Sequence, residues 1–306
     1  MINATSAHSD SRFHATPTVI GDLHMLKFTK PALAAAALAL LLSGCSAAAS
    51  PSSTGQASAT APKGLTTSGK LTLCIDPEYA PLEYYANGSG GDIAGFDADA
   101  ARALAKHWGV DAKFEVTTFD GLMPGLQTRR CDAIFGGLYM SKARLDVADA
   151  SAVMNAGPAI LSAPASTGNY KTALDLCGHS VAAQSASSNA ARITALKDEC
   201  KKAGKDEPKL TEYPKTAETV LAVLNGKSEA LIETNVAAAY MASQNEGKLS
   251  VAPGVFPADT TFGVFTRKND PLSPAIAQAL KDLHQDGTLA KIAKDNKLDP
   301  TIVDVP

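Results

Sequence analysis

One segment near the middle of the chain narrows the choice of fold more than any other. Leu122, Met123 and Leu126 share one face of a helix. Asp120 precedes them and is a suitable N-terminal cap. Residues 133–135 (Ala-Ile-Phe) then form the short apolar run that is typical of strands in parallel sheets. Ligands of open α/β sheets bind beyond the carboxyl ends of strands, so the segment predicts an α/β fold with a ligand site after residue 135.

The turn that follows this strand carries the side chains of an anion site. Two glycines at 136–137 leave room for a ligand to approach the backbone. Ser141 and Arg144 supply a hydroxyl and a guanidinium, whose planar fork can donate two parallel hydrogen bonds to a carboxylate. An exposed ion pair of Arg144 with Asp146 or Asp149 is the alternative interpretation. Because no obvious nucleophile or base accompanies them, we predict a binding site for a small anionic group.

The first residues of the chain have the pattern of an export signal. Lys27 and Lys30 precede an apolar run at 32–42, which is too short for a comfortable membrane span. Residues 42–45 (Leu-Ser-Gly-Cys) resemble the bacterial lipobox, in which the cysteine becomes the lipid-modified first residue. We therefore predict lipidation of Cys45, with an ordinary secretory signal and an incidental cysteine as the alternative.

A low-complexity linker separates this signal from the folded part. Residues 46–64 consist mostly of Ala, Ser, Thr, Pro and Gly, which cannot build a core. About 240 residues remain, enough for one large domain or two lobes. Before the folded part we predict a signal peptide at 1–44, of which 1–24 is a candidate over-long start, and a lipidated cysteine with a linker at 45–64. The folded part is predicted to consist of a first lobe at 65–158, a second lobe at 159–260, and a return to the first lobe with C-terminal helices at 261–306.

The composition excludes several kinds of ligand. A net charge of −3 and an aromatic content of 6% argue against nucleic-acid binding, which needs basic surfaces and stacking aromatics. No CxxC motif occurs, and the six histidines are scattered without the spacing of metal ligands. We therefore expect neither a metal site nor another cofactor.

Four cysteines remain besides Cys45, and an even number suits disulfides in an exported protein. Cys177 and Cys200 flank one strand–helix unit, and we predict that they pair. Cys74 and Cys131 lie on strands that we expect to be neighbours, which suggests a second bridge. Buried free thiols are the alternative for both pairs.

Strands and helices alternate through the folded part, which predicts two modules of parallel strands. In the first module we expect strands at 70–75, 114–117 and 133–135, and a helix capped by Asp97 that runs to Trp108. In the second we expect strands at 179–183, 210–213 and 230–232, and helices at 187–196, 216–224 and 236–242, the second of them capped by Thr216. A strand at 158–163 leaves the first module, and a strand at 261–266 returns before helices at 273–284 and 289–295. Two modules joined by two crossings predict a cleft with hinges.

Five segments of the chain form a wider pattern: 76–81, 95–99, 119–144, 230–240 and 280–298. In this order and at these spacings they resemble the bacterial extracellular solute-binding proteins of family 3, the amino-acid-binding receptors of ABC importers. The resemblance covers about residues 69–298. It implies two α/β lobes that close on a ligand, each a mainly parallel sheet flanked by helices, with two hinge crossings.

The resemblance also implies which residues contact the ligand. They are Asp76, Tyr79, Phe119, Gly137, Tyr139, Ser141 and Arg144 from the first lobe, and Ser187, Ser188 and Thr234 from the second. Tyr79 and Phe119 would form walls, and a helix that begins at Ser187 would suit a carboxylate. Three alternatives stay open: Asp76 as a turn former, Phe119 as a core staple, and the two serines as simple helix caps.

Three positions depart from the family pattern. Thr234 stands where the family presents an aspartate to the ligand's α-ammonium group, and a hydroxyl is a weaker partner for a cation. Strand alternation is expected to point the adjacent Glu233 away from that position. Tyr139 replaces a residue that is often small, and Ala186 replaces a glycine before the two serines. Carboxylate binding remains expected, whereas recognition of an α-amino group is in question.

The resemblance predicts an exported monomer, held at the membrane only by its lipid anchor, that delivers a small carboxylate-bearing solute to an ABC permease. The solute would be a polar amino acid or a derivative. Two alternatives use the same fold: an enzyme of the cyclohexadienyl or arogenate dehydratase type, and a ligand-sensing input domain. A dehydratase needs a tuned acid and base, and only Asp76 and Glu233 stand near the expected cleft. A sensor is usually followed by a membrane span, and no apolar run follows Ile292. We therefore predict a binding protein, not an enzyme.

Overall fold

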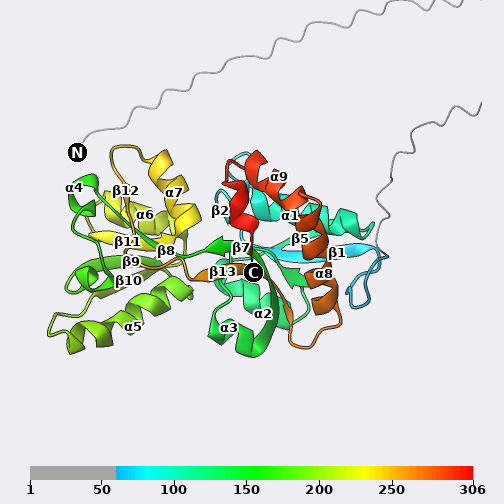
Figure 1. The fold of residues 1–306 in the computed structure, drawn as a ribbon, viewed down its shortest axis with the longest axis horizontal. Helices are drawn as coiled ribbons and strands as arrows, with labels where there is room; N and C mark the ends of the chain where they lie inside the picture. The colour runs from blue at the N-terminus through cyan, green and yellow to red at the C-terminus, as the bar shows by residue number, and fades with distance from the viewer. Residues whose placement is uncertain (1–59, 306) are drawn as a thin grey trace, which may run out of the picture. The chain divides into compact units, whose positions relative to one another are not determined.

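The computed structural model describes residues 60–305, which contain two five-stranded sheets (Figure 1). The predicted signal peptide, Cys45 and most of the linker lie outside the described residues. Within residues 60–305 no helix is both long and apolar enough to cross a membrane.

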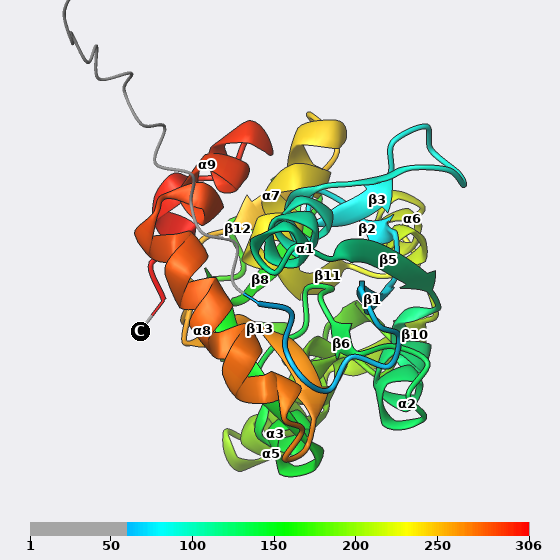
Figure 2. The ribbon, with the colours of Figure 1, turned by 90° about the vertical axis from the view of Figure 1, so that its right-hand side faces the viewer.

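The first sheet contains the three parallel strands that the sequence predicts. β1 pairs in parallel with β5 and β6, whereas β13 runs antiparallel to β6 and β7. In spatial order the strands are β5 (Asp111–Val116), β1 (Lys70–Ile75), β6 (Ala133–Ile134), β13 (Thr260–Arg267) and β7 (Ala148–Ala156). One face packs against α1 (Phe96–His107), α8 (Leu272–Gln285) and α9 (Thr288–Asp295), and the other against α2 (Leu122–Gln127) (Figure 2). Short helices η1 (Phe119–Gly121), α3 (Lys142–Val147) and η3 (Pro300–Val303) complete this lobe.

The second sheet repeats this plan with its own core. β9 pairs in parallel with β10 and β11, and β8 runs antiparallel to β11 and β12. In spatial order the strands are β10 (Lys209–Tyr213), β9 (Ser180–Gln184), β11 (Ala230–Thr234), β8 (Pro158–Ser162) and β12 (Ser250–Ala252). One face packs against α5 (Ser188–Lys202) and η2 (Ala173–Leu176), and the other against α6 (Thr216–Leu224) and α7 (Asn235–Gln244). Helix α4 (Pro164–Thr167) follows β8.

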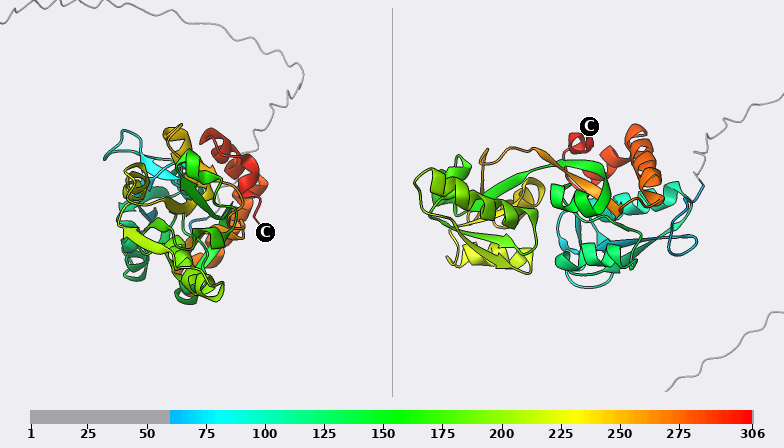
Figure 3. Two further views of the ribbon diagram at one scale, coloured as in Figure 1. Left: turned by 90° about the vertical axis from the view of Figure 1, so that its left-hand side faces the viewer. Right: turned by 90° about the horizontal axis from the view of Figure 1, so that it is seen from below.

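The chain passes between the two sheets twice (Figure 3). The first crossing is Gly157, between β7 and β8, and the second is the segment 253–259, between β12 and β13. The crossings touch, because a Cβ atom added at Gly157 would lie 2.5 Å from the Cα atom of Ala258. Glycine is therefore needed at this contact.

Several elements escaped the sequence analysis because partner strands, rather than local pattern, create them. β7 consists largely of small residues, yet it pairs along its length with β13. The small sheet of β2 (Glu78–Tyr79), β3 (Glu83–Tyr85) and β4 (Ile93–Ala94) has strands of two or three residues, which are too short to show a periodic pattern in the sequence. The polar turn at Ser141 is the start of the six-residue helix α3.

Three predicted helix caps are wrong. Asp97 lies in the first turn of α1 and is buried, and its carboxylate accepts a hydrogen bond from the backbone N–H of Gly137 at 2.7 Å. Lys215, not Thr216, occupies the N-cap position of α6, and Thr216 is buried. Asp120 lies within η1 and caps neither η1 nor α2.

Both predicted disulfides are present. Cys74 on β1 joins Cys131, which lies just before the neighbouring strand β6, at a Cα–Cα distance of 5.5 Å. Cys177 joins Cys200 of α5 at 5.6 Å. One bridge lies in each lobe, so neither restrains the movement of one lobe against the other.

Candidate ligand-binding cleft

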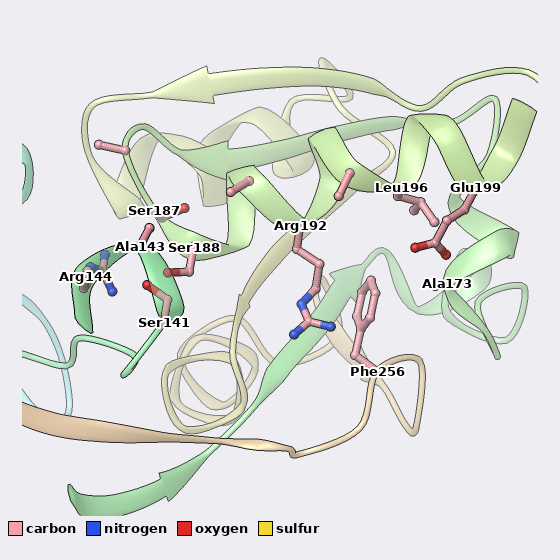
Figure 4. A pocket seen from close by; sticks show the side chains of 13 residues that line it. Ser141, Ala143, Arg144, Ala173, Ser187, Ser188, Arg192, Leu196, Glu199 and Phe256 are labelled. Carbon is pink, nitrogen blue, oxygen red and sulfur yellow. The ribbon is translucent and has the colours of Figure 1, made fainter. Parts of the chain in front are cut away.

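A cleft of about 630 Å³ lies where α3 of the first lobe faces α5 of the second (Figure 4). The first lobe contributes Ser141, Ala143 and Arg144. The second contributes the start and one face of α5 and two positions elsewhere in the lobe. The residues before and on the helix are Ala186, Ser187, Ser188, Ala191, Arg192, Ala195, Leu196 and Glu199, and the other two are Ala173 and Phe256. Four of the predicted contact residues, Ser141, Arg144, Ser187 and Ser188, therefore line one cleft.

Arg144 is a half-buried cation without an acidic partner among residues 60–305. Its Nη1 donates to the carbonyl oxygen of Tyr139 at 3.1 Å, and its guanidinium lies 5.7 Å from the ring centre of Phe119. Burial lowers the pKa of Arg144 to about 10. The alternative ion pairs are not formed, because Asp146 pairs with Lys142 and Asp149 pairs with Lys268. A ligand carboxylate would supply the missing charge.

Across the cleft, α5 begins with the two predicted hydroxyl residues. Ser187 is the N-cap, and its Oγ accepts a hydrogen bond from the backbone N–H of Ala190 at 3.0 Å. Figure 4 shows the side chains of Ser188 and Ser141 turned toward one another. Ala186, which precedes them, adopts a φ of 59°, a left-handed conformation that costs a non-glycine residue about 1 kcal/mol. The turn before α5 therefore carries some backbone strain at Ala186.

Arg192 is a cleft residue that the sequence analysis missed. It follows Ser188 by four residues, so the two share one face of α5. Its guanidinium lies 5.4 Å from the ring centre of Phe256 and 3.7 Å from a carboxylate oxygen of Asp259. Helical spacing from the predicted serines is the signal that could have identified it.

A second contact between the lobes lies at the start of α7. The hydroxyl of Tyr79 donates to Oε1 of Glu233 at 2.7 Å and lies 2.6 Å from Oγ1 of Thr234. The same Glu233 oxygen accepts the backbone N–H of Thr234 at 2.7 Å. Both second-lobe residues are 4% exposed, and burial raises the pKa of Glu233 to about 7.

The expected orientation of Glu233 is therefore wrong. Thr234 is already the N-cap of α7, and its Oγ1 accepts the backbone N–H of Ala237 at 3.3 Å. Strand alternation ends at this turn, so the carboxylate of Glu233 folds toward the helix start and meets Tyr79 as Thr234 does. The carboxylate of Glu233 thus lies beside Thr234, at which the resemblance implies an aspartate.

Two buried polar atoms on opposite lobes have no hydrogen-bond partner within residues 60–305. One is the hydroxyl of Tyr139, whose ring stacks on Phe262 with 5.2 Å between ring centres. The other is Oδ1 of Asn189, in the first turn of α5. A buried polar atom without a partner costs about 1–3 kcal/mol, so both atoms are suited to a polar ligand group.

The remaining predicted residues do not line this cleft. A Cβ atom added at Gly137 would lie 2.8 Å from Cε1 of Tyr79, and the backbone N–H of Gly137 donates to Asp97, so its predicted contact with a ligand stays a prediction. Phe119 lies against Arg144, as described above. Asp76 follows β1, where burial and the nearby Glu78 raise its pKa to about 6. Asp76, Tyr79, Phe119, Gly137, Tyr139 and Thr234 are all absent from the cleft lining.

Within residues 60–305 no cluster of three or more histidine, cysteine or acidic side chains could hold a metal ion. The cleft offers arginines, hydroxyls and a helix N-terminus, all of which suit an anion. This donor set can bind and orient a carboxylate.

Comparison with known proteins gives consistent matches. The model of the bacterial extracellular solute-binding proteins, family 3, matches residues 71–296. The L-cystine-binding protein TcyJ of Escherichia coli is 25% identical over 74% of this chain and 82% of its own length. The arginine-binding extracellular protein ArtP of Bacillus subtilis is 24% identical over 74% of this chain and 85% of its own.

Solved structures agree with these relatives. The amino acid ABC transporter substrate-binding protein AbpA of Streptococcus pneumoniae, bound to L-arginine, superposes with a TM-score of 0.65 at 25% identity, over 74% of this chain and 94% of that one. An ancestral amino acid-binding protein, a precursor of cyclohexadienyl dehydratase, gives a TM-score of 0.65 at 30% identity, over 74% and 95% of the two chains. The named relatives are binding proteins, which supports the prediction that this chain is not an enzyme.

Proposed function

We propose that this chain, which belongs to the bacterial extracellular solute-binding proteins of family 3, captures a small carboxylate-bearing solute between its lobes. The observation that carries the proposal is Arg144, a half-buried guanidinium in the cleft without an acidic partner among the described residues. A polar amino acid or a derivative is the solute class that we propose, since the relatives include cystine-binding and arginine-binding proteins.

The proposed contacts come from both sides of the cleft. Arg144 and Ser141 would hold the carboxylate from the first lobe, and Ser187 and Ser188 would meet it at the start of α5. The predicted residues outside the cleft lining would act as supports: Asp76, Tyr79, Phe119, Gly137, Tyr139 and Thr234. A ligand that binds both lobes stabilises the closed arrangement over the open one by its differential affinity for the two.

The proposal extends to transport. The closed protein would deliver its solute to an ABC permease, as a monomer tethered to the membrane through lipidated Cys45 alone. Export is in keeping with a family of extracellular proteins. The anchor, the monomeric state and the permease rest on the sequence and on the family.

A thermal-shift screen of amino acids, their derivatives and small carboxylates tests this function. A solute that binds only the folded state at 100 times its Kd stabilises the protein by about 2.7 kcal/mol and raises its Tm. The shift should disappear in Arg144→Ala and persist in Lys142→Ala, which removes an exposed cation from the same helix. Equal shifts in both variants, or no shift with any carboxylate, would overturn the proposal.

A further inference from the structure

We propose that Arg192 forms a second anion subsite, so that the preferred solute carries a second acidic group in addition to the carboxylate held by Arg144. This inference rests on the proposed function of the cleft and names the class of solute that it takes. Acidic amino acids such as glutamate, and amino acids such as cystine that carry a second carboxylate, have the required chemistry.

Arg192 lies in the same cleft as the proposed carboxylate site. Figure 4 shows its side chain between the cluster of Arg144, Ser141 and Ser188 on one side and Glu199 on the other. All of these residues line the same cleft. Arg192 lies one helical turn beyond Ser188 on the same face of α5, so a solute held at Arg144 and Ser188 would meet Arg192 if it extends along the helix.

The guanidinium of Arg192 is positioned by an aromatic ring. It lies over the ring of Phe256, with 5.4 Å between its central carbon and the ring centre. Arginines that stack on an aromatic face keep their N–H groups in the plane of the guanidinium, where they can donate to a carboxylate. Phe256 thus holds Arg192 in a geometry that suits an anion.

The existing ion pair of Arg192 with Asp259 is weak. The distance from Arg192 to Asp259 is 3.7 Å, and the aspartate side chain is 53% exposed. Exposed pairs of this kind contribute little to stability, so a ligand carboxylate can replace Asp259 at low cost. Asp259 also lies in the crossing segment 253–259, outside the cleft lining.

Positive charge exceeds negative charge in the cleft lining. The cleft lining contains two arginines and a single acid, Glu199. An amino acid with one carboxylate leaves the second guanidinium without a ligand partner. A cationic side chain such as that of arginine would place like charges together beside Arg192, which is unfavourable. This chain should therefore differ in preference from its arginine-binding relatives.

Calorimetry with matched solutes tests the inference. We would compare L-glutamate with L-glutamine, L-aspartate with L-asparagine, and L-cystine with L-methionine, and include L-arginine. In at least one pair the solute with the second acidic group should bind about tenfold tighter or more. In Arg192→Gln this preference should fall to near unity, while the solute with a single carboxylate should keep its affinity.

Arg102→Gln is the matched control. Arg102 also lies over a phenylalanine, 5.1 Å from the ring centre of Phe114, and pairs with Asp99, but it lies outside the cleft. This variant should keep the wild-type preference. Equal binding of the members of every pair, a preference for arginine, or a preference that survives Arg192→Gln would overturn the second subsite. Those results would leave the proposed function intact, whereas absence of binding by any carboxylate would refute the proposed function itself.

Discussion

Two helices of the second lobe, α5 and α7, begin at the same edge of one sheet but meet the first lobe in opposite ways. Each follows a parallel strand, β9 or β11, and each has a hydroxyl N-cap, Ser187 or Thr234. At α5 a cleft separates the helix start from Arg144. At α7 the hydroxyl of Tyr79 bonds directly to Glu233 and contacts Thr234.

The difference lies in which groups already have partners. At α5 the arginine of the first lobe has no acidic partner among the described residues, so its strongest interaction remains available to a ligand. At α7 the polar groups of the two lobes satisfy one another. We infer that α7 holds the lobes together and that α5 makes their closure depend on the solute.

The largest effect should come from Arg144→Ala. If this guanidinium binds the solute carboxylate, affinity should fall by about 2–5 kcal/mol, because the carboxylate would be left without its partner. Calorimetry with the solute identified by the screen measures the loss. Lys142→Ala should bind normally. An unchanged affinity in Arg144→Ala would show that the solute does not bind at α5, and α5 and α7 would then not differ in their dependence on the solute.

The next effect concerns the pH dependence of stability. Burial raises the pKa of Glu233 from its ordinary value of 4.5 to about 7 in the folded protein. Its stabilising contribution is therefore complete below about pH 4.5 and is lost as the pH rises through 7, an effect on the order of 2–3 kcal/mol.

Glu233→Gln should flatten this part of the pH profile, as measured by urea unfolding at pH 5 and pH 8. Burial also raises the pKa of Asp97, to about 6. Its effect on stability therefore falls with rising pH in the same direction, so a residual slope remains in both proteins. Identical slopes in wild type and variant would show that Glu233 does not titrate as a buried group at α7.

Tyr79→Phe should weaken the contact at α7 directly. The change removes the hydroxyl that bonds to Glu233 and should lower the free energy of unfolding by about 1–2 kcal/mol. It should also shift the population toward open lobes, which small-angle scattering detects as a larger radius of gyration. Tyr84→Phe is the control, since the Tyr84 hydroxyl has no hydrogen bond within residues 60–305. Equal behaviour of the two variants would contradict a role of Tyr79 in closure.

The smallest effect should distinguish the two serines at α5. Ser187→Ala removes a helix cap and should cost about 1 kcal/mol of stability, whereas Ser188→Ala should change stability by less than about 0.5 kcal/mol. Thermal unfolding of the solute-free variants measures both values. If the two variants are equally stable, capping does not explain Ser187, and its hydroxyl would be available to the solute alone.

Local pattern predicted the parts of the fold that depend on local physics. Parallel strands such as β1 and β11 are apolar runs, and α5 begins at a serine cap, so both are visible in the sequence. The site was predicted in part: Arg144 and the two serines line the cleft, whereas Tyr79 and Thr234 contact one another instead. Arg192 was not predicted, because no local motif marks it; only its helical spacing of four residues from Ser188 places it on the same face of α5.

The sequence by itself determined the alternation of strands and helices, the cysteines that pair, and an arginine after a buried strand. These follow from periodicity, residue chemistry and spacing, which act over short stretches of chain. Only the tertiary structure decided that β7 is a strand, that Glu233 turns toward Tyr79, and that Arg144 and Arg192 face one cleft. These features depend on groups that are far apart in the sequence, and only packing brings such groups into contact.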